Sequence, residues 1–215
     1  MPNKELQDMR ANYEASFLLE EHCDKDPVVQ FGRWFREAVE AAVHEPNAMA
    51  ISTVSAVGQP SVRMVLLKSY DQFGFTFYTN YDSKKGLHIA ENQHVALLFW
   101  WGTLERQIRI EGVAQKITKE ATASYFHTRP RGSQIAATIS EQSAVIKSRE
   151  ALEELYASRE KEYTGKEIPL TENWGGYVVK PVLFEFWQGR TSRLHDRIQY
   201  SLAADGLWKI ERLAP

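Results

Sequence analysis

Cysteine is nearly absent from this sequence of 215 residues, which contains only Cys23. A single thiol cannot form an intramolecular disulfide, and no Cys/His spacing typical of zinc sites is present. A reducing compartment suits such a chain, so we expect a cytoplasmic protein. The first residues lack the apolar core of a secretory signal, and the apolar run at 95–101 is too short to span a membrane.

Excess charge of one sign is also missing, since 26 basic and 28 acidic residues give a formal net charge of -2. A protein with a broad basic surface for nucleic acid is therefore excluded, although local basic clusters could bind small anions. Hydrophobic residues make up 43% of the chain, which is ordinary for a globular protein. We expect a mobile N-terminal arm at residues 1–25 and a single domain at 26–215.

Several well-known site motifs are absent, namely the glycine-rich dinucleotide fingerprint, the Walker A loop, the HExxH zinc motif and the GxSxG elbow. The six histidines are scattered, and none pairs with another at metal-ligand spacing, so we expect no metal. A phosphate ligand, if one binds, must be held by side chains rather than by a glycine-rich loop.

The hydrophobic pattern predicts an antiparallel β core, forming a barrel, with several helices around it. Asp26 and Pro27 resemble the start of a helix, and apolar residues at helical spacing extend it to residue 44. Strands are predicted at 48–56, 61–70, 75–80, 94–101, 105–117 and in four segments after residue 173, and further helices at 83–93, 119–128 and 148–163.

Basic residues recur at the ends of these elements. Arg63 and Lys68 lie in one otherwise apolar segment, but residues five apart face opposite sides of a regular strand. Lys84 and Lys85 fall in the first turn of a helix that Ser83 can cap. Cations there oppose the helix dipole unless an anion is present. From these segments alone, solvent-exposed side chains explain Arg63 and Lys68 as well as anion binding does, and explain Lys84 and Lys85 better.

A third group lies near a proline break. Tyr125 and Arg129 are four residues apart on one helix face, and Ser133 follows. Two hydroxyls and a guanidinium are good donors for a phosphate dianion. The plain alternative is a helix C-terminus neutralised by arginine.

The segment FEFWQGRTSRLHDR at 184–197 contains the fourth group. Arg193, His195 and Arg197 alternate, so they share one face if the chain is extended, and such a cluster calls for an anionic or electron-rich partner. An Arg/His pair also suits hydride or proton chemistry. Trp187 by itself is more often a core residue.

Taken together, these segments resemble the pyridoxamine 5′-phosphate oxidase family. The motifs that carry the likeness are RMVLLK, FYTN, DSKKG, LERQIRIEG, YFHTRPRGSQI, EQSAVI, WGGY, EFWQG, RLHDR and ERLAP, in order from about Asp26 to Pro215. The resemblance implies an FMN-binding split barrel that works as a homodimer, with FMN at the interface.

The resemblance also implies site residues. Those expected to bind FMN are Arg63, Met64, Val65, Leu66, Leu67, Lys68, Tyr78, Thr79, Lys84, Lys85, Gln107, Gln142, Ser143, Trp187 and Arg197. The substrate phosphate is expected on Lys68, Tyr125, Arg129 and Ser133. Arg193, Leu194 and His195 are expected at the substrate ring, with Arg193 and His195 catalytic, and Arg10 and Tyr13 of the arm are expected to close over it.

The implied reaction is oxidation of pyridoxamine 5′-phosphate or pyridoxine 5′-phosphate to pyridoxal 5′-phosphate, with O2 as acceptor and H2O2 as product, plus ammonia from the amine. Lys84 stands where the family often has arginine, which loses a bidentate fork. The segment after Tyr13 is more acidic than expected of bacterial members. A carrier of FMN or pyridoxal phosphate without turnover, and another split-barrel flavoenzyme such as a flavin reductase, are the alternatives.

Overall fold

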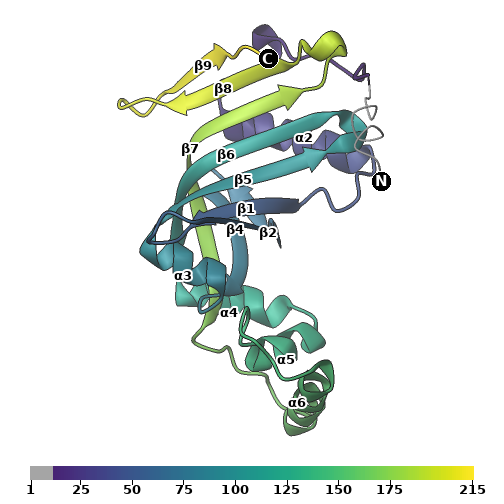
Figure 1. Cartoon of the computed structure of the whole chain (residues 1–215), viewed down its shortest axis with the longest axis vertical. Helices are drawn as coiled ribbons and strands as arrows, with labels where there is room; N and C mark the ends of the chain where they lie inside the picture. The colour runs from purple at the N-terminus through teal and green to yellow at the C-terminus, as the bar shows by residue number, and fades with distance from the viewer. Residues whose placement is uncertain (1–11) are drawn as a thin grey trace. The chain divides into compact units, whose positions relative to one another are not determined.

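The computed structural model describes residues 12–215, so the expectation for Arg10 lies outside the described residues. The chain divides into two compact units, each treated by itself below (Figure 1). Unit 1 comprises residues 1–50, 97–111 and 181–215, and unit 2 comprises residues 51–96 and 112–180.

Nine strands of the described chain belong to one sheet, with the order β2-β1-β5-β6-β7-β4-β3, while β8 pairs with β7 and with β9. The strands are β1 (Ala48–Val54), β2 (Pro60–Leu66), β3 (Ser69–Asp71), β4 (Gly74–Asn80), β5 (His94–Trp101), β6 (Arg106–Lys116), β7 (Trp174–Gln188), β8 (Asp196–Leu202) and β9 (Trp208–Arg212). The pairings of β3 with β4, β4 with β7, β7 with β8, and β8 with β9 are antiparallel.

The helices are α2 (Pro27–Glu40), α3 (Lys84–Glu91), α4 (Lys119–Thr128), α5 (Arg131–Ile139) and α6 (Arg149–Glu162), with short 3-10 turns η1 (Glu20–His22), η2 (Gly102–Leu104) and η3 (Thr191–Arg193). This combination of an antiparallel sheet with surrounding helices confirms the predicted α+β fold class. None of the helices in residues 12–215 is long and apolar enough to cross a membrane.

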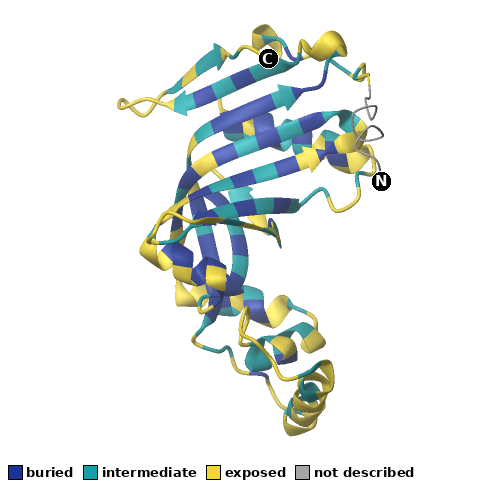
Figure 2. Ribbon diagram, viewed as in Figure 1, coloured by how far each residue is buried: buried dark blue, intermediate teal, exposed yellow. Residues whose placement is uncertain are grey.

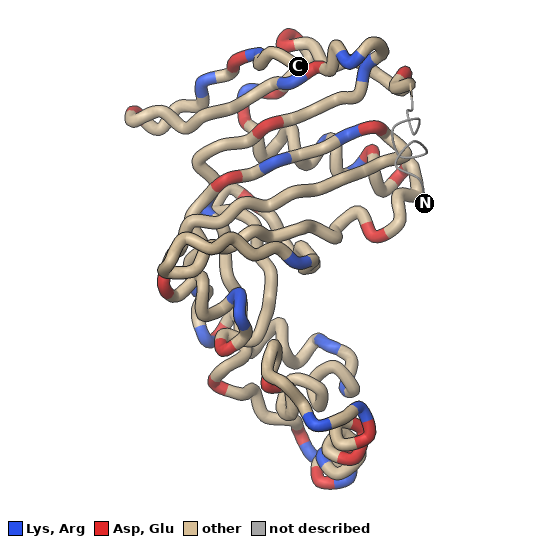
Figure 3. Tube along the Cα trace, in the orientation of Figure 1, with Lys and Arg blue, Asp and Glu red and all other residues tan. Residues whose placement is uncertain are grey.

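Helix starts follow the predicted capping chemistry. The Asp26 carboxylate accepts a hydrogen bond from the backbone N–H of Val28 at 2.8 Å, with Pro27 at the first helical position. Helix α2 ends at Glu40 rather than at residue 44, because Ala42 takes a left-handed conformation with φ of 52°. Charged residues of both signs mix along α6, which has no buried residue (Figure 3).

Strand β7 is one continuous element of 15 residues, although the sequence predicts two strands broken near Pro181. Strand β4 pairs with β7 up to Val179, and β8 pairs with it from Leu183 onward. Pro181 falls between these two ladders, where its missing N–H costs no hydrogen bond to β4 or β8.

Helix α5 is absent from the sequence prediction. Helix α4 ends at Thr128 as expected before Arg129 and Pro130, but the chain then turns into a second helix with Pro130 at its N-cap. Helix α5 contributes buried Ile135 to a cluster with Phe126, Ile168 and Trp174 in unit 2. Figure 2 shows that most of α6 is exposed, whereas α5 is largely intermediate. Tertiary packing, rather than local propensity, therefore defines α5.

Candidate functional site

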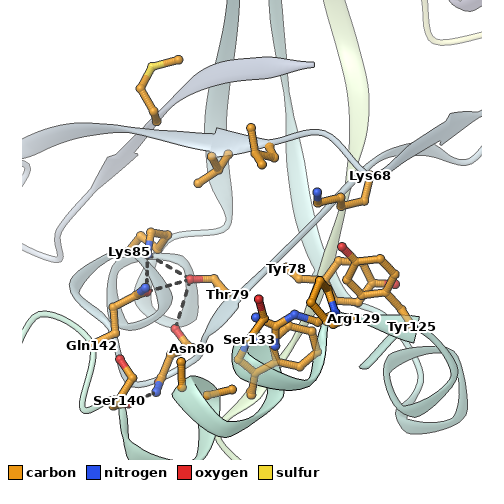
Figure 4. A pocket seen from close by; sticks show the side chains of 17 residues that line it. Lys68, Tyr78, Thr79, Asn80, Lys85, Tyr125, Arg129, Ser133, Ser140 and Gln142 are labelled. Carbon is orange, nitrogen blue, oxygen red and sulfur yellow. Dashed lines mark hydrogen bonds between the residues drawn. The ribbon is translucent and has the colours of Figure 1, made fainter. Parts of the chain in front are cut away.

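A cavity of about 500 Å³ opens in unit 2 (Figure 4). This volume is in the range of pockets that bind small molecules and cofactors. Its lining residues are Met64, Val65, Leu66, Lys68, Tyr78, Thr79, Asn80, Lys85, Tyr125, Arg129, Pro130, Ser133, Ala136, Ala137, Ser140, Gln142 and Trp174. Many residues expected to bind FMN or the substrate phosphate are thus brought together, from strands β2, β4 and β7, helices α3, α4 and α5, and adjoining loops.

One side of this cavity is built around Lys85 in the first turn of α3. Its Nζ donates to Gln142 Oε1 at 2.6 Å, to Thr79 Oγ1 at 2.9 Å and to Ser83 Oγ at 3.3 Å. None of these acceptors carries a charge. Burial, with a smaller contribution from the nearby Arg63 cation, lowers the pKa of Lys85 to about 8. A buried ammonium group at a helix N-terminus, with neutral partners only, favours an anion as ligand.

The opposite side of the cavity holds Lys68, Tyr125, Arg129 and Ser133 (Figure 4). The Arg129 guanidinium lies 4.5 Å from the Trp174 ring centroid, and its buried Nη1 has no hydrogen-bond partner among residues 12–215. Burial lowers the pKa of Arg129. A half-buried cation with an unused donor, beside two hydroxyls and an ammonium, has the donors that a doubly charged phosphate requires.

Aromatic rings support this second group. Tyr78 stacks on Tyr125 with ring centroids 3.9 Å apart, and Trp174 stacks on Tyr78 at 5.3 Å. These rings fix the position of the Tyr125 hydroxyl at the cavity wall.

Segment 63–68 separates Arg63 from Lys68, as strand alternation predicts for residues five apart, although the consecutive residues 64–66 all line the cavity. Arg63 does not line the cavity; its guanidinium donates to Ile51 O at 3.1 Å, to Thr53 Oγ1 at 2.8 Å and to Ser61 Oγ at 2.7 Å. Leu67 is buried with 5% of its surface exposed, whereas Lys68 lies in the lining. Arg63 and Lys68 therefore do not meet at one point.

Lys84 and Ser143 line a neighbouring cavity of about 860 Å³ in unit 2. The backbone N–H of Lys84 donates to Ser143 Oγ at 3.3 Å, and Ser143 takes a left-handed φ of 79°. Gln142 lines both cavities, and Ser143 lines only the second.

Unit 1 contains a separate cluster around His195. The imidazole lies 4.7 Å from the Trp187 ring and 5.7 Å from the Tyr13 ring, and Tyr13 meets Trp187 edge-on at 5.8 Å. The backbone N–H of Arg190 donates to His195 Nδ1 at 3.1 Å. That bond leaves Nδ1 without a proton in the neutral ring, so Nε2 carries the hydrogen and is available as a donor.

Arg193 departs from the expected extended chain. It ends the 3-10 turn η3, and both Ser192 and Arg193 have positive φ, at 56° and 61°. The premise that Arg193, His195 and Arg197 alternate on one face of an extended strand is therefore wrong, because only Arg197 lies within β8. Arg193 and Leu194 are exposed.

Arg197 is held by a residue that sequence reasoning missed. Glu185 on β7 accepts from Arg197 Nε at 3.0 Å and from Nη2 at 3.1 Å, and Arg109 Nη2 lies 3.3 Å from the same carboxylate. The Glu185 side chain is only 3% exposed. The sequence could have indicated this role, because Glu185 is a charged residue inside an otherwise apolar predicted strand. Gln107 is half-buried on β6.

An antiparallel sheet with cationic and hydroxyl side chains on two sides of one cavity, and elsewhere an imidazole among aromatic rings, fits the class of enzymes with phosphorylated ligands. Among residues 12–215, no three His, Cys, Asp or Glu side chains are grouped so that they could hold a metal ion. The family model "Pyridoxamine 5′-phosphate oxidase" matches residues 35–158, and "Pyridoxine 5′-phosphate oxidase C-terminal dimerisation region" matches residues 174–215. The chain belongs to the pyridoxamine 5′-phosphate oxidase family.

Curated relatives agree with this assignment. The chain is 52% identical over its full length to pyridoxine/pyridoxamine 5′-phosphate oxidase 1, chloroplastic, of Arabidopsis thaliana, of which it spans 41%. It is 51% identical to the pyridoxine/pyridoxamine 5′-phosphate oxidase of Acaryochloris marina, covering 98% of this chain and 95% of that one. The Janthinobacterium sp. protein of the same name is 50% identical, with 98% and 99% covered.

Solved structures support the fold. The crystal structure of PhzG from Burkholderia lata, in complex with tetrahydrophenazine-1-carboxylic acid, superposes with a TM-score of 0.89 at 28% identity, covering 95% of this chain and all of that one. A pyridoxamine 5′-phosphate oxidase-related, FMN-binding protein from Nostoc punctiforme gives 0.65 at 16% identity, covering 84% and 97%. The second likeness concerns the split-barrel fold alone.

Proposed function

We propose that this chain is an FMN-dependent oxidase that converts pyridoxamine 5′-phosphate or pyridoxine 5′-phosphate to pyridoxal 5′-phosphate. O2 is the electron acceptor and H2O2 is released, with ammonia from the amine. The observation that carries the substrate class is the buried, unpartnered Arg129 Nη1 in a cavity shared with Lys68, Tyr125 and Ser133. Relatives about 50% identical bear the name of this activity.

The residues present fit FMN. Lys85, Thr79 and Gln142 form a connected donor and acceptor set at the N-terminus of α3, where a cofactor phosphate would be held. Met64, Val65 and Leu66 add apolar and backbone surface from β2 in the same cavity. When bound, FMN supplies the two-electron redox chemistry, with O2 as final acceptor. The further contacts assigned to FMN are Arg63, Leu67, Lys68, Tyr78, Lys84, Gln107, Ser143, Trp187 and Arg197.

The protein's own contribution is binding and orientation. Lys68, Tyr125, Arg129 and Ser133 hold the substrate phosphate, which fixes one end of the substrate. Four donors on that group explain why vitamers without a phosphate should be poor substrates.

At the substrate ring, His195 donates from Nε2, because the Arg190 backbone N–H occupies Nδ1. Arg193 is free to place its guanidinium against the ring and to stabilise charge there, since it is exposed on η3. Leu194 and Tyr13 supply apolar surface beside these two groups. Arg10 keeps its expected role as a lid residue.

The chain forms a homodimer, in keeping with the dimerisation region that matches residues 174–215. Trp187, Arg193, His195 and Arg197 all fall inside that region. This supports a site at the dimer interface, with FMN bound there. A cytoplasmic location, and the division into an arm at residues 1–25 and a domain at 26–215, remain predictions.

Aerobic turnover tests the function. The purified protein is loaded with FMN, pyridoxine 5′-phosphate is added, and pyridoxal phosphate and H2O2 are followed together. We expect equal amounts of both over many turnovers, and poor turnover of pyridoxine. Yellow protein that binds the substrate without releasing peroxide would identify a carrier. Turnover that required a nicotinamide donor would identify a flavin reductase.

The lowered pKa of Lys85 predicts pH-dependent FMN affinity. Burial favours the uncharged amine, so Lys85 loses its proton as the pH rises through about 8, and its attraction for a phosphate falls. We expect the FMN dissociation constant, measured by flavin fluorescence, to rise between about pH 7 and 9.5. Lys85→Met should bind more weakly with a flatter profile. Lys84→Met removes an exposed lysine that is also assigned to FMN, so it should weaken binding but keep the wild-type slope.

A flat wild-type profile would contradict the assignment of Lys85 to the cofactor phosphate. Thermal unfolding of each variant without FMN separates loss of affinity from loss of fold.

A further inference from the structure

Arg212, on the last strand of unit 1, binds three different groups with one guanidinium. Its Nε and Nη2 donate to the two carboxylate oxygens of Glu20, each at 2.7 Å. Its Nη1 donates to Asp196 Oδ1 at 2.7 Å, and Nη2 also donates to the backbone carbonyl of Leu18 at 2.8 Å. A bidentate arginine with this many short contacts fixes geometry far better than a single surface ion pair.

Asp196 makes the same connection from the other side. Its Oδ2 accepts from the backbone N–H of Leu18 at 3.0 Å, and Arg190 Nη1 lies at 3.4 Å. The Asp196 side chain is 14% exposed. The carboxylates of Glu20 and Asp196 therefore balance the charges of Arg190 and Arg212. Asp196 directly follows His195 in the sequence, so the network adjoins the imidazole.

The segment that this network holds reaches the His195 cluster. The Leu18 side chain is 3% exposed, and the backbone N–H of Ala15 donates to Glu105 Oε2 at 3.0 Å. Tyr13 then packs edge-on against Trp187 and His195. Space for this ring depends on Gly189, because a Cβ there would lie 2.8 Å from Tyr13 Cγ.

We propose that Arg212 is a positioning residue, which acts with Asp196 and Glu20 to hold residues 13–20 so that Tyr13 packs on His195 and fixes the imidazole for the substrate. The proposal rests on the proposed function for what His195 binds. Arg212 itself does not touch the substrate. Its effect passes through Leu18 to Tyr13, and through Asp196 to the neighbouring His195.

The charges of the network persist over the pH range of an assay. The Arg212 guanidinium lowers the pKa of Glu20 to about 2, and the two carboxylates raise that of Arg212. The stabilising contribution of Glu20 is present above the unfolded-state pKa of 4.5 and is lost only as the pH falls toward 2. Experiments near neutral pH thus examine the intact network.

The test compares Arg212→Gln with Arg212→Lys and with Lys209→Gln in FMN-loaded, full-length protein. Lys209 is a matched control on the same strand, with its own surface ion pair to Glu211 at 2.7 Å. We expect Arg212→Gln to raise KM for pyridoxine 5′-phosphate by roughly tenfold with little change in kcat, because the loss falls equally on bound substrate and transition state. The KM of Arg212→Lys should lie between those of wild type and Arg212→Gln, and the KM of Lys209→Gln should match wild type.

A second readout does not depend on turnover. Nitrogen-15 NMR of the histidine rings reports tautomer and environment, and the His195 signals should shift in Arg212→Gln but not in Lys209→Gln. If Arg212→Gln does not fold, Glu20→Gln removes the bidentate partner without altering β9 and should give the same change in KM and the same His195 shift.

A folded Arg212→Gln with wild-type KM and unchanged His195 signals would overturn the proposal. A wild type without oxidase turnover, whose His195 signals still shift on Arg212→Gln, would overturn the proposed function and leave the positioning role supported.

Discussion

Arg129→Ala is expected to raise KM for pyridoxine 5′-phosphate by about 10- to 150-fold, with a smaller change in kcat. A hydrogen bond to a charged group contributes about 1.5–3 kcal/mol, and each 1.4 kcal/mol is a factor of ten in binding. Arg129 is suited to a large effect because it is half-buried, lines the cavity, and has at Nη1 a donor with no hydrogen-bond partner among residues 12–215. Steady-state kinetics of the FMN-loaded protein measure it.

Packing must be separated from charge in this experiment. The Arg129 guanidinium also lies over Trp174 at 4.5 Å and over Phe126 at 5.7 Å, and alanine removes both contacts. Arg129→Met retains much of the packing while losing the charge, so it should raise KM almost as much as alanine with less change in thermal stability. Arg129→Lys should recover part of the affinity but not the planar fork.

Arg131→Ala is the matched control, since Arg131 is exposed two residues away and donates to the backbone carbonyl of Lys166 at 3.1 Å. Its KM should stay near wild type. The unphosphorylated vitamer provides a second control, because its poor turnover should be nearly insensitive to Arg129→Ala. An unchanged KM for the phosphorylated substrate would remove Arg129 from the phosphate site.

Local rules predicted much of this molecule. The Asp26 cap and the end of α4 before Arg129 depend only on nearby backbone chemistry. The alternation that buries Arg106, Ile108 and Ile110 on β6 depends only on strand geometry. The spacing of Tyr125 and Arg129 predicted one helix face; Arg129 is instead the extended C-cap of α4, yet both side chains line one cavity.

Other features depend on groups distant in sequence. Helix α5 exists because Ile135 packs with Phe126, Ile168 and Trp174, which no local pattern reveals. The left-handed residues Ser192 and Arg193 break an apparent strand alternation that the letters alone supported. These failures share a cause: tertiary contacts override local preference at positions where only the folded chain supplies the partner.

Glu185 illustrates the same limit in electrostatic terms, since its two partners come from other strands. Arg197 lies on β8, where it is opposite Trp187 rather than Glu185, and Arg109 lies on β6. No sequence pattern shows that one buried carboxylate balances two guanidinium groups. Removal of the Glu185 carboxylate should therefore lower the free energy of unfolding by more than removal of one partner of a surface ion pair does.

Glu185→Gln is expected to lower the free energy of unfolding by about 3 kcal/mol. The variant keeps the size of the side chain but leaves Arg197 and Arg109 facing each other across a neutral amide. Their side chains are 27% and 42% exposed, so water recovers part of the lost interaction, and the cost falls at the low end for a broken buried pair. Urea unfolding should show a lower midpoint with an unchanged slope.

Glu111→Gln is the control for this prediction, because Glu111 meets the same Arg109 at 3.4 Å but is 48% exposed. Its cost should be under about 1 kcal/mol. A double-mutant cycle then separates pairing from packing: in an Arg197→Met background, Glu185→Gln should cost clearly less than it does alone. Equal costs of Glu185→Gln in both backgrounds would show that pairing with Arg197 does not determine its cost. Equal costs for Glu185→Gln and Glu111→Gln would show that burial of the carboxylate does not determine it either.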